Sequence, residues 1–242
     1  MAEFRLDAAS VDALPLRWLR QIGRQLLHNA LIFDFGAWGY AWMTGNPIWH
    51  TNSAHLLDGV PAQSDQFWVL DLGAGPGNSA LAMGEQRPEA RFIAFDLASQ
   101  MLALAAQHRT GAGWAAQRLA PVQGNAFDLP LADRSVDVVT GHSFLYLLPD
   151  YSAVLAEAYR VLRPGGYIAF LEPHAGLVDW QWLLTQPWAG LQISLSLWRI
   201  YSWLHRRFSA ERLQTALTEA GFHAIRTEVT LGGFGIFGRG QK

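Results

Sequence analysis

The chain has 242 residues, of which half are hydrophobic and 16% are charged, and its formal net charge at pH 7 is −2. A chain of this length and composition can bury one sizeable core, so we expect a globular protein without a general attraction for nucleic acid. Cysteine is absent. This excludes disulfides, thiolate nucleophiles and cysteine-based metal sites, and we expect no metal centre.

No membrane-spanning or secretory segment is evident in the sequence. The first seven residues include two acids where a signal peptide would carry positive charge. The most apolar stretch, 183–200, is interrupted by polar residues, proline and glycine. We therefore expect a cytoplasmic protein.

From position 66 onward, short apolar runs alternate with helical patterns, which is typical of βα units around a mostly parallel sheet. The apolar runs closed by Gly, Asp or Pro predict strands at 67–72, 91–96, 136–140 and 167–172. Apolar residues at helical spacing predict helices at 78–86, 99–108 and 151–162. The fold class is therefore α/β.

The C-terminal part follows a long apolar insertion. Helical spacing predicts a helix at 210–220, and two further strands are predicted at 224–229 and 234–238. Only residues 230–233 separate these two strands. A parallel return needs a much longer crossover, so we expect the two strands to pair antiparallel.

A glycine-rich segment, Gly73-Ala74-Gly75-Pro76-Gly77, lies directly between the first predicted strand and helix. In that position the missing side chains let the backbone approach a nucleotide-type ligand closely, although a tight turn without a ligand is an alternative. The segment lacks the Lys and Ser or Thr of a phosphate-binding P-loop. Asn78 stands where a dinucleotide fingerprint has its third glycine, so an NAD-dependent oxidoreductase is the second choice.

Two aspartates point to the kind of ligand. Asp96 ends the second predicted strand, at the offset where a carboxylate accepts hydrogen bonds from ribose hydroxyls; the alternative is a helix N-cap. Asp71 ends the strand beneath the glycine-rich segment, where its charge would attract an ammonium or sulfonium and repel a pyrophosphate. Together they favour S-adenosylmethionine.

Four segments carry a resemblance to a known family: 71–77 (DLGAGPG), 95–96 (FD), 123–130 (QGNAFDLP) and 161–166 (VLRPGG). The sequence resembles class I S-adenosylmethionine-dependent methyltransferases. This resemblance implies a Rossmann-like, mostly parallel seven-stranded sheet with an antiparallel C-terminal strand and helical caps. It also implies that 124–126 contacts the adenine, where Asn125 replaces a more common Asp and still offers an acceptor oxygen.

The expected site and domain layout follow from these observations. The expected cofactor-binding residues are Asp71, Gly73, Ala74, Gly75, Asp96, Leu97, Met101, Asn125, Ala126, Phe127 and His142. We expect one methyltransferase domain over 1–242. Its parts are an N-terminal helical cap (1–61), a core (62–175 and 209–242) and a helical insertion over the acceptor site (176–208).

Ligands of open α/β sheets bind beyond the carboxyl ends of the strands, which nominates the residues after the fourth and fifth predicted strands. These are His142, Ser143, Tyr146, Glu172 and His174. His142 and His174 are the candidate catalytic bases for an acceptor that must lose a proton. The alternative for each is a polar residue that lines the cofactor pocket.

Nine of the eleven tryptophans fall before the core or in the insertion, where an acceptor pocket would be built. An aromatic lining favours a small apolar, aromatic or prenyl-bearing acceptor, with ordinary cap packing as the alternative. Two amphipathic patterns accompany them. These are Leu19, Ile22, Leu26 and Ala30, and Ile193, Leu197, Ile200, Leu204 and Phe208. Either could contact a membrane surface or dock on the domain.

A second resemblance, carried by segments 33–43 and 231–240, is to quinone-biosynthesis C-methyltransferases and phospholipid N-methyltransferases. The stretch 141–146 departs from the quinone group, so O- or N-methylation of another small molecule stays open. A non-catalytic S-adenosylmethionine-binding protein is a further alternative. A methyltransferase acting on RNA or protein is disfavoured because no basic stripe is present. The sequence leaves the oligomeric state open.

Overall fold

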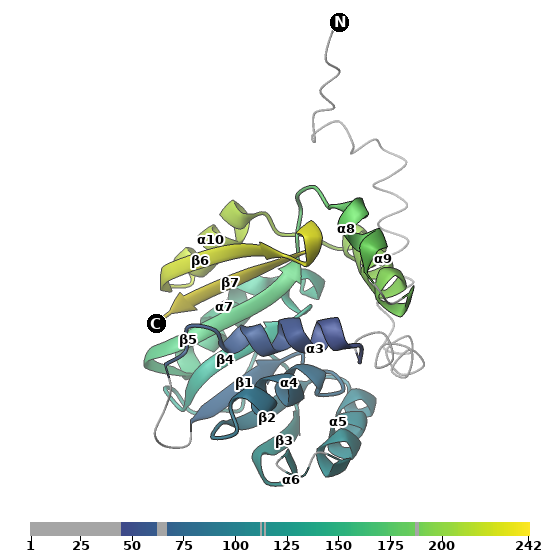
Figure 1. Ribbon diagram of the computed structural model, residues 1–242. Helices are drawn as coiled ribbons and strands as arrows, with labels where there is room; N and C mark the ends of the chain where they lie inside the picture. Colours follow the sequence, from purple (N-terminus) through teal and green to yellow (C-terminus); the bar gives the residue numbers. More distant parts are fainter. Residues whose placement is uncertain (1–44, 62–66, 112, 114, 187–188) are drawn as a thin grey trace, which may run out of the picture.

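A computed structural model describes residues 45–61, 67–111, 113, 115–186 and 189–242. In this part of the chain, seven strands form one sheet in the order β3-β2-β1-β4-β5-β7-β6 (Figure 1). The strands are β1 (Trp68–Leu72), β2 (Arg91–Asp96), β3 (Leu119–Gln123), β4 (Val136–His142), β5 (Leu162–Pro173), β6 (His223–Thr230) and β7 (Gly235–Gln241). The pairings from β3 to β5 are parallel, and β7 runs antiparallel to both β5 and β6.

The sheet confirms the α/β fold class and the antiparallel C-terminal pair. One strand, β3, has no counterpart among the runs read from the sequence. It lies at the sheet edge beside β2, it is half-exposed and it contains Pro121, so it shows no continuous apolar run. β4 extends two residues beyond its predicted end and thereby includes His142.

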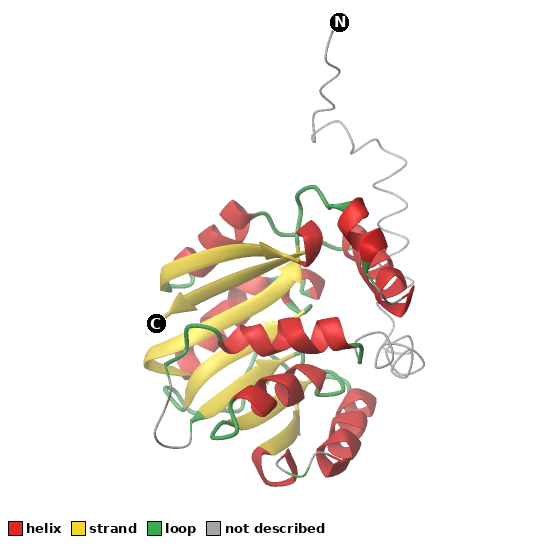
Figure 2. Cartoon of the chain, in the orientation of Figure 1, coloured by secondary structure: helices red, strands yellow, loops and turns green. Residues whose placement is uncertain are grey.

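Helices cover both faces of the sheet (Figure 2). They are α3 (Pro47–Ala54), α4 (Asn78–Gln86), α5 (Ser99–Gly111), α6 (Ala115–Arg118), α7 (Tyr151–Val161), α8 (Trp180–Thr185), α9 (Ala189–Leu204) and α10 (Ala210–Glu219), with short 3-10 turns η2 (His55–Leu57), η3 (Leu145–Leu147) and η4 (Leu231–Gly233). Successive residues of a strand point to opposite faces of the sheet, so a core cluster lies on each face. Leu70 and Phe170 pack in a cluster with α7 and α10, whereas Val69 and Leu171 pack in a second cluster with η2 and α4.

Residues 1–44, which include the predicted amphipathic helix around 19–30 and most of the predicted N-terminal cap, lie outside the described residues. The described chain begins just before α3. Asn46 caps this helix by accepting hydrogen bonds from the backbone N–H groups of Ile48 and Trp49, and Pro47 takes its first position. Among the residues that the structure describes, no helix is long and apolar enough to cross a membrane.

The insertion between β5 and α10 folds into α8 and α9. α9 buries the side that carries Leu191, Leu195 and Trp198. Its predicted apolar face is largely the outer one. Ile193, Leu197 and Ile200 on it are exposed by 50%, 45% and 60%. Phe208 does not belong to this face, because α9 ends at Leu204 and Phe208 is fully buried in the core.

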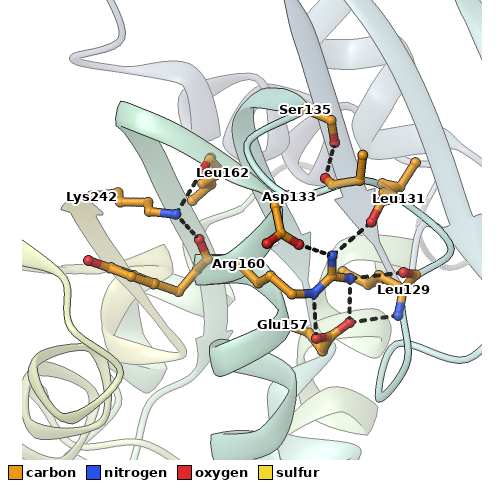
Figure 3. Close-up of polar contacts among 10 residues, drawn as sticks. Leu129, Leu131, Asp133, Ser135, Glu157, Arg160, Leu162 and Lys242 are labelled. Carbon is orange, nitrogen blue, oxygen red and sulfur yellow. Dashed lines mark hydrogen bonds and ion pairs between the residues drawn. The ribbon is translucent and has the colours of Figure 1, made fainter.

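A network of hydrogen bonds lies at the amino ends of β4 and β5 (Figure 3). The Arg160 guanidinium donates to the Glu157 and Asp133 carboxylates and to the carbonyl oxygens of Leu129 and Leu131. Each of these hydrogen bonds is 2.8 or 2.9 Å long. The network therefore fixes the loop that leads into β4 against the end of α7.

The segment 161–166, one of the four that carry the family resemblance, includes the last residue of α7 and the first residues of β5. α7 ends at Val161, one residue before its predicted end, and Leu162 already pairs with Val136 of β4. Gly165 then takes a positive φ of 77°, and its N–H donates to the Lys242 carbonyl oxygen. The pairing with the C-terminal residues makes this turn an irregular part of the sheet.

Candidate functional site

The glycine-rich segment connects β1 to α4 at the carboxyl edge of the sheet. Gly73, Gly75 and Gly77 all have positive φ, and Gly77 caps α4 in the left-handed conformation. A Cβ atom at Gly73 would overlap the Phe144 ring, which lies on the loop after β4. The close approach of these two loops therefore requires glycine at position 73.

Asp71 lies beneath this segment and is fully buried. Its carboxylate accepts hydrogen bonds from Ser79 Oγ on α4 at 2.5 Å and from Thr140 Oγ1 on β4 at 2.9 Å. Burial raises the pKa of Asp71 to about 6, against the opposing effect of the two hydroxyl donors. Asp71 thus connects β1 to α4 and to β4. Because the carboxylate is fully buried, its influence on a ligand above the loop would be electrostatic.

Asp96 ends β2 and bridges two segments of the site. Its Oδ2 accepts from the Gly75 N–H and its Oδ1 from the Ala98 N–H, both at 2.8 Å. Burial raises the pKa of this carboxyl. The bond to Ala98 lies just ahead of α5, where the sequence offered a helix N-cap as the alternative role of Asp96. The bond to Gly75 connects the same carboxylate to the glycine-rich segment. Beyond it, Leu97 is 71% exposed and Met101 on α5 is buried.

The segment after β3 reaches the same edge. The Gly124 N–H donates to the Asp96 carbonyl oxygen at 3.0 Å. Asn125 is exposed, and its Oδ1 accepts from the Phe127 N–H at 3.1 Å. Ala126 packs against the core, while Phe127 is partly exposed. The carboxyl ends of β1, β2 and β3 therefore bring together every predicted cofactor-binding segment except His142, which follows on β4.

His142 ends β4 and lies in an aromatic cluster. Its Nδ1 shares a hydrogen bond of 3.3 Å with Ser53 Oγ of α3, and its ring centroid lies 5.0 Å from that of Trp49. Burial lowers the pKa of His142 to about 4. At pH 7 the imidazole is therefore neutral.

His174 follows β5 and has a different set of neighbours. Its Nδ1 interacts with the Gly233 carbonyl oxygen at 3.1 Å, and its own carbonyl oxygen accepts from the Arg199 guanidinium of α9. Its backbone N–H donates to the Phe234 carbonyl oxygen. His174 thus anchors the start of the insertion, whereas His142 faces α3.

Glu172, nominated from the sequence, is fully buried. Its carboxylate accepts three backbone N–H groups, from Phe144, Leu145 and Tyr146, at 2.8 to 3.1 Å. Burial raises the pKa of Glu172 to about 7 despite these donors. Glu172 therefore holds the loop after β4, which includes Ser143 at a positive φ of 56°.

Four contributors to this edge were not singled out individually from the sequence: Ser53, Ser194, Trp49, which contacts His142, and Trp198, which contacts Trp49. Trp49 Nε1 donates to Ser194 Oγ of α9 at 2.7 Å. The rings of Trp49 and Trp198 meet edge-on with centroids 4.9 Å apart. Because Trp49 and Ser194 are 145 positions apart, tryptophan enrichment was the only sequence signal.

Comparison with known proteins identifies the family of this chain. A family profile described as a methyltransferase domain matches residues 70–170. A demethylmenaquinone methyltransferase of Lactiplantibacillus plantarum is 34% identical over 169 residues, which cover 65% of this chain and 70% of that protein. This chain belongs to the S-adenosylmethionine-dependent methyltransferases.

A further relative and a solved structure are also similar to this chain. A malonyl-[acyl-carrier protein] O-methyltransferase of Xylella fastidiosa is 34% identical over 136 residues, covering 55% of this chain and 45% of that protein. A Haemonchus contortus phosphoethanolamine N-methyltransferase, solved with S-adenosylhomocysteine, shares the fold at 16% identity. Its TM-score is 0.67, with 90% of this chain and 59% of that chain covered.

The cofactor of this methyltransferase is S-adenosylmethionine, and the predicted seven-stranded Rossmann-like fold is confirmed. The two alternatives weighed on the sequence, an NAD-dependent oxidoreductase and a non-catalytic binding protein, receive no support from these relatives.

Proposed function

We propose that the enzyme methylates a small acceptor that is apolar or aromatic and binds between α3, β4 and α9. The observation that carries this proposal is the cluster of Trp49, His142 and Trp198, which lies next to the glycine-rich segment. Their proximity follows from the sheet, because Gly141 of β4 pairs with Leu72 of β1. Apolar rings with a few polar atoms are typical of small-molecule sites. The names of two relatives, a demethylmenaquinone methyltransferase and a ubiquinone/menaquinone biosynthesis C-methyltransferase, point to acceptors of this kind.

The cofactor is proposed to lie across the carboxyl ends of β1 to β3. Gly73, Ala74 and Gly75 offer backbone with no large side chain, and Gly73 and Gly75 take the positive φ that favours glycine. Asp96 offers a carboxylate for two ribose hydroxyls. Asn125, Ala126 and Phe127 would surround the adenine together with Leu97 and Met101. These residues fit a nucleoside without phosphate groups, because none of them is the Lys or Arg that would bind phosphate.

A methyl group on a sulfonium already has a good leaving group, so the protein chiefly supplies proximity and orientation. The neutral imidazole of His142 is a hydrogen-bonding partner at pH 7 but, with a pKa of about 4, a weak proton acceptor. His174 remains the candidate base for an acceptor that must lose a proton. We also propose that 1–61 and 176–208 act as caps on a core made of 62–175 and 209–242.

Isothermal titration with S-adenosylmethionine, S-adenosylhomocysteine and NAD tests the cofactor site. We expect micromolar affinity for the first two and none for NAD. Methylation assays with quinols, phenols and lipids as acceptors then test the acceptor class. If small polar acceptors alone were methylated, the apolar acceptor would be abandoned while the methyltransferase assignment stood.

We also propose a cytoplasmic protein that contacts a membrane surface through the outer side of α8 and α9. Trp180, Leu184 and Ile200 on this side are at least half exposed, and no acidic residue occurs between Asp179 and Glu211. Co-sedimentation with phosphatidylcholine–phosphatidylglycerol vesicles should be lost in Ile200→Glu. Equal sedimentation of Ile200→Glu and the original protein would remove this contact.

A further inference from the structure

Two ring nitrogens at the carboxyl edge of the sheet are buried without a hydrogen-bond partner. They are His142 Nε2, at the end of β4, and Trp198 Nε1, on α9. Within the described part of the chain they are the only ring nitrogens with this property. Buried polar groups in folded proteins are paired as a rule, so two unpaired groups in one cluster indicate a place for a ligand of complementary chemistry.

Trp49 connects the two unpaired groups. Its ring centroid lies 5.0 Å from that of His142 and 4.9 Å from that of Trp198. The Nε1–H group of Trp49 donates to Ser194 Oγ, whereas that of Trp198 has no hydrogen-bond partner. The cluster thus combines apolar ring faces with two polar atoms that have no protein partner.

The chemistry of the two atoms restricts the ligand. Trp198 Nε1 is a donor only. His142 Nε2 can take either role, because Ser53 Oγ and His142 Nδ1 share a hydrogen bond in which either atom can donate. The imidazole is neutral at pH 7, so it does not favour an anion. An oxygen atom suits both positions, since a hydroxyl accepts from Trp198 and donates to His142, and a carbonyl oxygen accepts from both.

We propose that His142 Nε2 and Trp198 Nε1 bind an oxygen atom carried on an aromatic ring of the methyl acceptor, while Trp49 packs against that ring. This inference rests on the proposed function, which locates an apolar acceptor in the cluster, and it adds the polar group by which the acceptor is selected. His142 follows Gly141, which pairs with Leu72 of β1, so an acceptor held by His142 lies near the glycine-rich segment.

A matched pair of probes tests the proposal on the unmodified protein. 1-Naphthol and 1-methylnaphthalene have rings of the same size, and only the first carries an oxygen. In calorimetric titrations with S-adenosylhomocysteine present, 1-naphthol should bind about tenfold more tightly, because the analogue leaves both nitrogens unpaired. Equal affinity for the two probes, or binding of neither, would overturn the proposal.

Two substitutions locate the preference. Trp198→Phe keeps an aromatic ring but removes the N–H, and it should reduce the tenfold preference to about twofold. His142→Gln should reduce it as well. Trp180→Phe is the matched control, because Trp180 is half exposed on α8, and it should leave the preference unchanged. An undiminished preference in both Trp198→Phe and His142→Gln would also overturn the proposal.

The same samples separate this inference from the proposed function. S-Adenosylmethionine should bind Trp198→Phe and Trp180→Phe as tightly as the original protein, which also shows that these two variants are folded. Normal cofactor binding without a preference for 1-naphthol would reject the oxygen site alone. A protein that failed to bind S-adenosylmethionine would instead reject the proposed cofactor site.

Discussion

The polar network around Arg160 and the cluster of His142 and Trp198 differ in how their polar groups are paired. At the amino ends of β4 and β5, Arg160 uses its guanidinium in five hydrogen bonds to Glu157, Asp133 and two carbonyl oxygens. At the carboxyl ends, the buried ring nitrogens of His142 and Trp198 have no partner among the described residues. Saturated groups hold structure, whereas unsaturated buried groups are free to bind a ligand. The carboxyl edge is therefore where we place the site.

Some buried polar groups at the carboxyl ends of the strands are hydrogen-bonded. Asp71 and Glu172 are fully buried there, and their carboxylates accept two and three hydrogen bonds from the protein. They support the loops on which the site is built. Substitutions at the two ends of the sheet should therefore separate stability from ligand binding.

The largest effect on ligand binding is expected for Asp96→Ala. It removes the carboxylate proposed for the ribose hydroxyls and also releases the Gly75 N–H. Hydrogen bonds to a charged group contribute about 1.5–3 kcal/mol, so the affinity for S-adenosylmethionine should fall by roughly 10- to 100-fold in calorimetry. Asp58→Ala, which removes a surface carboxylate, is the control. Unchanged affinity in Asp96→Ala would remove the ribose assignment.

A smaller effect, on stability alone, is expected for Arg160→Ala at the opposite end. The substitution leaves the carbonyl oxygens of Leu129 and Leu131 without this donor. Because the site is partly exposed, the free energy of unfolding should fall by about 1–2 kcal/mol in denaturant titration. The affinity for S-adenosylmethionine should not change. A large loss of cofactor affinity would show that the two ends are coupled.

A different kind of effect is expected in the pH dependence of Glu172→Gln. Burial raises the folded-state pKa of Glu172 to about 7, above its ordinary value of 4.5. The folded state therefore binds more protons than the unfolded state between pH 4.5 and 7, and this contribution to stability is full below pH 4.5 and lost as the pH rises to 7. Glutamine does not titrate, so the fall in stability over this range should be weaker. Parallel stability curves for both proteins would contradict the raised pKa.

Local chemistry explains what the sequence could predict. Strand β2 was located to the residue because an apolar run ends at Asp96, and the glycine-rich segment was placed between β1 and α4 because glycine and strand patterns coincide there. β3 was missed because an edge strand with Pro121 has no distinctive pattern. The contact of Ser53 with His142 could not be predicted either, since it joins residues 89 positions apart through the tertiary fold.

Helix α3 is attached to three separate parts of the protein. Ser53 contacts His142 of β4, Trp49 donates to Ser194 of α9, and Asn52 accepts from Thr230 of β6. We expect a bulky acceptor that enters between α9 and β4 to displace the contact of Ser53 with His142 or that of Trp49 with Ser194, and its product to do so again when it leaves. We expect exchange of product for new acceptor to limit turnover, so that rapid-mixing experiments show a burst of methylated product in the first cycle.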